Sequence, residues 1–184
     1  MKKSLFVLGL CLGIVVNAVA YTRILSSSTG IAAYWPSMPI HYFINQQGSS
    51  QINNDSEFLA VHAAFQSWAN VPTANVRFNY LGPAVITAGV NDGVNLVSFS
   101  DSTFPFGSGT LAVTLSYFSS STGVISEGDI LFNPNQLWST SGESGRYDVQ
   151  SVLTHEIGHF LGLDHSGMVS SVMEPFGTTG PRCR

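Results

Sequence analysis

The sequence predicts an α+β fold, because it contains both strand and helix patterns and these do not alternate along the chain. Four runs rich in β-branched and aromatic residues lie in the middle of the chain, at positions 76–80, 94–99, 110–118 and 123–132. One segment with apolar residues at helical spacing precedes these runs, and a second such segment follows them. Strands grouped between an early and a late helix are typical of α+β domains.

The early part of the chain predicts one strand and one helix. Residues 39–45 form a short apolar run, and Asp55 is a candidate N-cap for the helix that follows. The buried face of this helix is expected to carry Phe58, Val61, Phe65 and Trp68. His62 lies near that face and has no partner ligand four residues on, so we expect a partly buried, hydrogen-bonded histidine rather than a metal ligand. The same expectation holds for His41.

The late part of the chain predicts a hairpin and a second helix. Ser-Ser-Ser-Thr at 119–122 separates the last two strand runs, which indicates an antiparallel hairpin. Asp148 is a candidate N-cap for the second helix. The packed face of this helix is expected to contain Val149, Val152, Leu153 and Ile157.

The first twenty residues have the three sections of a secretory signal peptide. Lys2 and Lys3 precede an apolar run at 5–16, which is followed by small residues up to Ala20. We therefore expect residues 1–20 to be a signal peptide cleaved after Ala20, and the protein to be secreted. No later segment approaches the length needed to cross a bilayer, so no stable membrane anchor is expected. The Ser- and Thr-rich residues 21–34 are expected to be an N-terminal arm, and residues 35–184 a single domain.

Charge and cysteine content exclude some functions for the mature chain. Of the seven basic residues, Lys2 and Lys3 leave with the signal peptide, so five arginines face eleven acidic residues. This balance, with no basic run, excludes nucleic acid and anionic membranes as expected partners. Only Cys183 remains of the two cysteines, so an internal disulfide is not expected.

The most informative segment is the eleven residues from 155 to 165. On a helix, His155 and His159 lie on one face, with Glu156 beside the first of them. Gly162 permits a left-handed turn that brings His165 back toward the same point. Three protein ligands leave a fourth position for water, which is typical of catalytic zinc rather than structural zinc. The alternative is histidines kept for a surface or a hydrogen bond, but this spacing would arise by chance in about one of 10⁵ such sequences.

The spacing predicts the chemistry as well as the metal. Zinc lowers the pKa of its water, Glu156 takes the proton as water attacks a carbonyl, and the metal stabilises the developing negative charge. The spacing therefore predicts hydrolysis at a carbonyl carbon, with one catalytic Zn²⁺ ion.

The same segment resembles the metzincin metallopeptidases, whose motif is His-Glu-x-x-His-x-x-Gly-x-x-His followed by a methionine turn. Ser166 after the third histidine is similar to the matrixins, and Met173 lies in a stretch that resembles their Ala-Leu-Met-Tyr-Pro turn. Gly-Asp-Ile-Leu-Phe-Asn at 128–133, with Trp138 beyond it, and Gly-Thr-Leu-Ala-Val at 109–113 also resemble matrixin segments.

The resemblance covers about 35–176 and implies that residues 35–184 form a matrixin-like catalytic domain. It also implies that the protein is a secreted zinc-dependent endopeptidase that acts on protein or peptide substrates. Its expected fold is a twisted mixed β-sheet with an early helix and a zinc-binding active-site helix, and its cleft follows an edge strand. Met173 is implied to be a hydrophobic floor beneath the zinc ligands, and Gly158 and Gly162 to allow close packing and chain reversal.

Several positions depart from the matrixin pattern. The histidines of a second, structural zinc fall at Val113 and Leu131, so we expect that site to be absent. Asn133 and Gln136 replace calcium-binding acids, and neutral amides lose most of the charge on which calcium affinity depends. The acids that remain as alternative calcium ligands are expected to be turn formers instead; they are Asp92, Asp101 and Asp129.

The resemblance also implies how substrate binds. An extended peptide would add to an edge strand formed by Leu111, Ala112, Val113 and Thr114. Pro175 and Phe176 would line a pocket beside the zinc that accepts an apolar side chain. The phenylalanines Phe104, Phe106 and Phe118 are expected to be core residues rather than pocket residues.

Two other functions remain open from the sequence. One is a secreted, non-catalytic zinc-binding interaction module. Matrixin domains usually continue into another helix after the methionine turn, but the eleven residues after Met173 are not expected to form one, because they include Gly177, Gly180 and Pro181. Glu156 argues for catalysis, because a pure zinc scaffold does not need it. The other is hydrolysis of a non-peptide amide, which uses the same zinc chemistry.

A further hypothesis concerns latency. Pro-Arg-Cys at 181–183 resembles the start of the matrixin inhibitory motif Pro-Arg-Cys-Gly, so Cys183 is an inhibitory zinc-ligand candidate, and pairing with another molecule is the alternative.

Overall fold

The computed structural model describes residues 21–99, 107–175 and 179. The expected signal peptide, Phe104 and Phe106 lie outside these residues. A search of the described residues for helices able to cross a membrane finds none.

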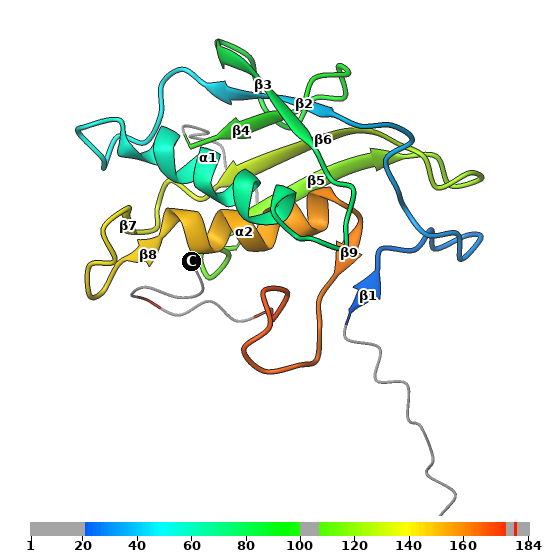
Figure 1. Ribbon diagram of the computed structural model, residues 1–184. Helices are drawn as coiled ribbons and strands as arrows, with labels where there is room; N and C mark the ends of the chain where they lie inside the picture. The colour runs from blue at the N-terminus through cyan, green and yellow to red at the C-terminus, as the bar shows by residue number, and fades with distance from the viewer. Residues whose placement is uncertain (1–20, 100–106, 176–178, 180–184) are drawn as a thin grey trace, which may run out of the picture.

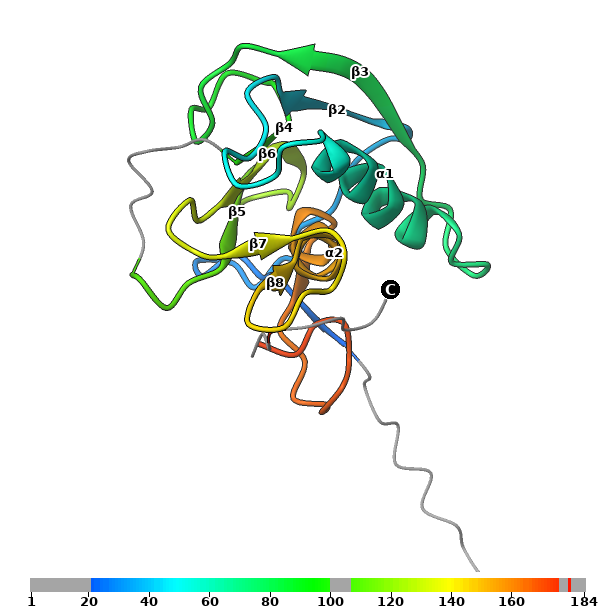
Figure 2. The same cartoon turned by 90° about the vertical axis from the view of Figure 1, so that its left-hand side faces the viewer.

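A five-stranded mixed sheet covers two helices. Its strand order is β3 (Phe78–Ala84), β2 (Ile40–Asn45), β4 (Leu96–Ser98), β6 (Ile125–Phe132) and β5 (Ala112–Phe118). β5 is antiparallel to β6, and the other pairs are parallel. Seen from the side, the sheet curves around α1 (Ser56–Ala69) and α2 (Val149–Phe160), which lie against the same face (Figures 1 and 2). The expected α+β fold with an early and a late helix is confirmed.

Short strands hold the segments around α2. β1 (Thr22–Arg23) pairs antiparallel with β9 (Leu163–Asp164), and β7 (Trp138–Ser139) pairs with β8 (Tyr147–Asp148). The segment expected to be an N-terminal arm therefore lies against the domain, and Tyr34 also forms a bridge with Val124. Two-residue strands leave no alternating pattern in a sequence, so this contact had no signal there.

Each predicted strand run contains a strand, although the bounds move. The largest shift is in β3, which begins at Phe78 and continues four residues past the predicted end, to Ala84. The hairpin of β5 and β6 forms as predicted, with Ala112 opposite Phe132 at its open end. β5 is last in the strand order and, among the described residues, pairs only with β6, so it is an edge strand of this sheet.

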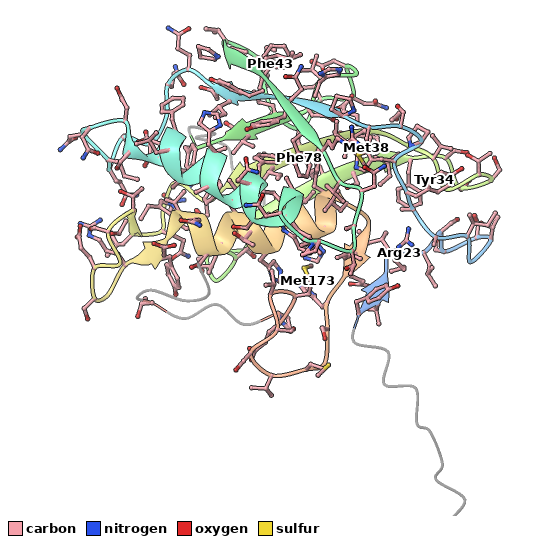
Figure 3. The ribbon with its side chains drawn as sticks, viewed as in Figure 1. Arg23, Tyr34, Met38, Phe43, Phe78 and Met173 are labelled. Carbon is pink, nitrogen blue, oxygen red and sulfur yellow. The ribbon has the colours of Figure 1, made fainter. Side chains whose placement is uncertain are left out.

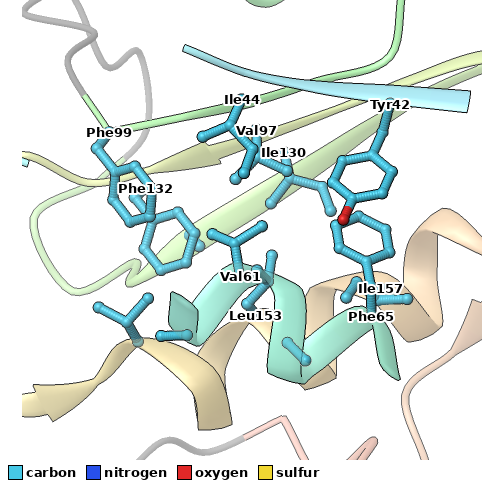
Figure 4. Close-up of a cluster of buried hydrophobic side chains, with 14 of the residues drawn as sticks. Tyr42, Ile44, Val61, Phe65, Val97, Phe99, Ile130, Phe132, Leu153 and Ile157 are labelled. Atoms are coloured by element: carbon cyan, nitrogen blue, oxygen red, sulfur yellow. The ribbon is translucent and has the colours of Figure 1, made fainter. Parts of the chain in front are cut away.

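The core lies between the sheet and the two helices (Figure 4). Val61 and Phe65 from α1 meet Leu153 and Ile157 from α2, and all four side chains are at most 3% exposed. Above them lie sheet residues that include Ile44, Val97 and Ile130. Burying a side chain of this size contributes roughly 1.5–3 kcal/mol. This packing fixes α2, which carries the histidine motif, against α1 and β5.

One predicted helix cap is wrong. Asp55 precedes α1, but its φ of 54° is left-handed and its side chain makes no capping hydrogen bond. A capping side chain needs extended backbone at this position, which directs its oxygen to the first helical N–H groups. Asn54 instead accepts a hydrogen bond from the Ser56 N–H, at 3.3 Å.

Asp129 is not a turn former, contrary to the prediction. It lies within β6, is 1% exposed, and its carboxylate accepts hydrogen bonds from the N–H groups of Gly89 (2.6 Å) and Leu96 (2.9 Å). Burial raises the pKa of Asp129 to about 6. Asp92 does form a turn, since it accepts from the Val94 N–H at 3.0 Å, and Asp101 lies outside the described residues.

The two histidines outside the motif differ in exposure. His62 is partly buried, and a 3.0 Å hydrogen bond joins its Nδ1 to the Tyr42 hydroxyl, as expected. Burial lowers the pKa of His62. His41 is hydrogen-bonded to the Asn79 amide at 3.1 Å but is exposed, so the expectation of partial burial is wrong for it. Its side chain points away from the core because strand residues alternate in direction, and its neighbours Ile40 and Tyr42 face inward.

Candidate metal centre

The helix that carries the motif begins and ends as its sequence predicts. The Asp148 carboxylate accepts a hydrogen bond from the Ser151 N–H at 2.9 Å and so caps α2. After the helix ends, Gly162 adopts a φ of +89°, and a Cβ there would lie 2.6 Å from the Ala33 carbonyl oxygen. Only glycine fits both the left-handed backbone and this close approach. The chain then reverses through β9 and returns to His165.

The three histidines meet at one point. The Nε2 atoms of His155 and His159 are 3.1 Å apart, and each lies 3.2 Å from the Nε2 atom of His165. Among the described residues, these three form the one group of three or more His, Cys, Asp or Glu side chains that is close enough to hold a metal.

Backbone carbonyls fix the orientation of two of the rings. His155 Nδ1 lies 2.8 Å from the Val172 oxygen, and His159 Nδ1 lies 2.8 Å from the Leu163 oxygen. A carbonyl only accepts, so each Nδ1 donates its proton and each Nε2 presents a lone pair. Burial lowers the pKa of His155 to about 4 and also lowers that of His159, which keeps both rings neutral near pH 7. Neutral imidazole is the metal-binding form.

The donor set fits zinc. Zn–N bonds of roughly 2.0–2.1 Å in a tetrahedral site place the nitrogen atoms about 3.3–3.4 Å apart, close to the separations found here. Unprotonated nitrogens this close repel one another unless a cation lies between them. Three nitrogen ligands also leave a fourth tetrahedral position for water or substrate.

Glu156 follows His155 on α2 and is 5% exposed. The Thr114 hydroxyl, from β5, lies 2.7 Å from its Oε2 atom and 3.0 Å from its backbone oxygen. Burial raises the pKa of Glu156 to about 7, while the hydrogen bond from Thr114 acts in the opposite direction. A carboxylate near its pKa at neutral pH can both accept and return a proton.

A cavity of about 420 Å³ adjoins the histidines. Among the residues predicted to bind substrate, Leu111, Ala112 and Pro175 line it, whereas Val113 and Thr114 lie farther along β5 and do not. Its wall also includes Tyr147 and Val152. Phe176 and Cys183 lie outside the described residues.

Met173 lies directly below α2, as Figure 3 shows. It is 4% exposed, and a Cβ at Gly158 would overlap its sulfur and lie 2.9 Å from its methyl carbon. The Met173 carbonyl accepts a hydrogen bond from the Ser166 N–H at 2.7 Å, which ties the turn to the residue after His165.

Several supports of the site had no clear signal in the sequence. The indole N–H groups of Trp68 and Trp35 donate to the carbonyls of Thr154 (2.8 Å) and Phe160 (2.6 Å) in α2. A tryptophan donor needs a partner when buried, but the sequence does not identify that partner. The Thr114 contact with Glu156 was also missed.

The positions that depart from the matrixin metal sites have other roles. Val113 and Leu131 are opposite each other in the β5–β6 pair. The Asn133 amide donates to the Thr110 oxygen at 2.7 Å, and the Gln136 amide donates to the Ser108 oxygen at 2.5 Å. Both amides therefore secure the segment that leads into β5.

Comparison with known proteins agrees with this geometry. The family model described as Matrixin matches residues 34–182. Karilysin from Tannerella forsythia is 26% identical over 145 residues, which are 78% of this chain and 29% of karilysin. Metalloendoproteinase 2-MMP from Arabidopsis thaliana is 31% identical over 126 residues, 65% of this chain and 31% of that protein. Human matrix metalloproteinase-26 is 52% identical over 48 residues, 26% of this chain and 18% of that protein. The chain thus spans less than a third of the length of each of these relatives.

Proposed function

The chain belongs to the matrixin family, and from this membership we propose that it is a zinc-dependent endopeptidase with Glu156 as its general base. The observation that carries the proposal is the convergence of three Nε2 atoms within 3.1–3.2 Å, beside a buried glutamate and a cavity. His155, His159 and His165 would hold one zinc ion. Bound zinc supplies Lewis acidity, which activates water and stabilises negative charge on a substrate oxygen.

The protein groups complete the chemistry. Glu156 accepts the proton of the attacking water and passes it to the leaving amine. The Val172 and Leu163 carbonyls keep two ligand rings in the required tautomer. Because Glu156 is only 5% exposed, few bulk water molecules can reach its carboxylate and compete with the attacking water for it.

A peptide substrate fits the edge of the sheet. Within the described part of the chain β5 pairs with β6 alone, so an extended peptide can add along its other edge by main-chain hydrogen bonds. One substrate side chain would then enter the adjoining cavity, where Leu111, Val152 and Pro175 favour an apolar group. The cavity volume of about 420 Å³ is sufficient for a large side chain.

A peptide-library cleavage assay tests the proposal. Hydrolysis should require zinc and stop with a chelator, and metal analysis should give one zinc per chain. Glu156→Ala should still bind zinc, but its rate of peptide hydrolysis should fall at least ~10²-fold, which is the smallest rate loss expected when a general base is removed. If the zinc-loaded protein cleaves no peptide, the non-catalytic binding module is supported instead; cleavage of only non-peptide amides supports the third function.

We also propose that the protein is exported. The charged, apolar and small-residue sections of residues 1–20 support this, and N-terminal sequencing of the protein from culture medium should begin at Tyr21. A product that begins at Met1 and stays in the cell contradicts it.

A further inference from the structure

Thr114 contacts the proposed general base from a different part of the fold. It lies on β5, 42 residues before Glu156, and its hydroxyl oxygen is 2.7 Å from Glu156 Oε2. This length is ordinary for a hydrogen bond that a hydroxyl donates to a carboxyl oxygen. The hydroxyl is also 3.0 Å from the Glu156 backbone oxygen, so it contacts both ends of that residue.

The contact leaves the two carboxylate oxygens unequal. Thr114 donates a hydrogen bond to Oε2, whereas no hydrogen bond to Oε1 is found among the described residues. A flexible glutamate side chain on a helix otherwise samples several rotamers. Because β5 is fixed by its register with β6, where Thr114 is opposite Ile130, the hydroxyl is a rigid donor.

We infer that Thr114 is a positioning residue that holds Glu156 in one orientation, with Oε1 directed to the attacking water. This inference rests on the proposed function, because it assigns Thr114 a role through Glu156. The Thr114 side chain does not line the cavity that adjoins the histidines. Its hydroxyl should therefore affect the rate of proton transfer rather than the binding of substrate.

Three substitutions separate the hydroxyl from the shape of the side chain. Thr114→Val keeps the branched shape and removes the donor, Thr114→Ser keeps the donor, and Thr114→Ala provides a second donor-free variant should the valine protein not fold. Ser116→Ala is the matched control, since Ser116 lies two residues on along β5 and its buried hydroxyl has no partner among the described residues.

The expected result is a loss in kcat alone. Thr114→Val and Thr114→Ala should lower kcat about 10-fold, because a small misplacement of a catalytic group can lower the rate by up to ~10²-fold. KM should stay within about twofold of the wild-type value. Thr114→Ser should recover kcat to within about threefold of wild type, and Ser116→Ala should match wild type. Zinc affinity, measured by chelator competition, should be the same in all five proteins. With Glu156→Gln present, adding Thr114→Val should have no further effect on kcat.

The outcomes distinguish this inference from the proposed function. Wild-type protein without chelator-sensitive hydrolysis overturns both. A large loss in Glu156→Ala with full kcat in Thr114→Val overturns the inference and leaves the function standing. An equal loss in Thr114→Ser and Thr114→Val, or weaker zinc binding in Thr114→Val, assigns Thr114 a structural role and also overturns it.

Discussion

Gly158→Ala should destabilise the protein although it places a better helix former in the middle of α2. Gly158 lies between His155 and His159, and its missing side chain leaves the space that Met173 fills. A Cβ there would overlap the Met173 sulfur and lie 2.9 Å from its methyl carbon and 3.2 Å from Trp68 Cζ2.

Two opposing energies set the expected size of the effect. Replacing glycine by alanine within a helix stabilises it by roughly 1 kcal/mol. Forcing an extra methyl into a filled core costs roughly 1–3 kcal/mol, and Met173, at 4% exposure, has little room to withdraw. Because a Cβ would overlap the Met173 sulfur outright, the cost should lie in the upper part of this range, at roughly 2–3 kcal/mol. The expected net loss of unfolding free energy is then about 1–2 kcal/mol, which lowers Tm by about 2–6 °C in a domain of this size.

Thermal unfolding of a double-mutant cycle tests the cause. If the overlap with Met173 is responsible, Gly158→Ala should become neutral or stabilising when Met173→Ala is also present. Gly107→Ala is the control, because no described residue lies within 4 Å of a Cβ at that position. A Gly158→Ala protein at least as stable as wild type would refute the packing of Met173 against the helix.

Three further predictions concern the supports of the site. Asp148→Ala should lower the unfolding free energy by about 1 kcal/mol in urea, because the Ser151 N–H loses its cap. Burial raises the pKa of Asp129 from 3.8 to about 6, so the folded protein binds this proton more tightly than the unfolded chain does. The contribution of Asp129 to the unfolding free energy is then greatest below about pH 4 and falls by about 3 kcal/mol as pH rises through 6. Urea unfolding at several pH values should show this fall in the wild-type protein and not in Asp129→Asn. Ile24→Pro deletes the N–H that donates to the Gly162 oxygen at 2.9 Å and should weaken zinc binding about 10-fold by chelator competition.

The three histidines proposed to hold zinc could be identified from the sequence because their geometry is local. Two of them, His155 and His159, lie one helical turn apart, and a glycine at 162 is enough to return the third. The Asp148 cap was predictable for the same reason, since an N-cap acts on residues three positions away.

Features that depend on distant pairing could not be predicted. Asp129 has the sequence surroundings of a turn residue, but its partners Gly89 and Leu96 are more than thirty positions away, and that pairing fixes its burial. The contact of Thr114 with Glu156 depends in the same way on how β5 lies across α2. The lengths of the strands depend on their neighbours, which is why β3 extends past its apolar run to follow β2.

The rigidity of the metal centre comes from residues outside the eleven-residue motif. Trp68 and Trp35 hold carbonyls of α2, and Met173 fills the space at Gly158. His165 is positioned separately, because β9 leads into it and is paired with β1 near the start of the described chain. An isolated helix with the same motif would present two imidazoles but would lack the carbonyls that orient them and the strand that returns the third. A preformed ligand set avoids an ordering cost on metal binding, so zinc affinity here should depend on the tertiary fold as much as on the histidines.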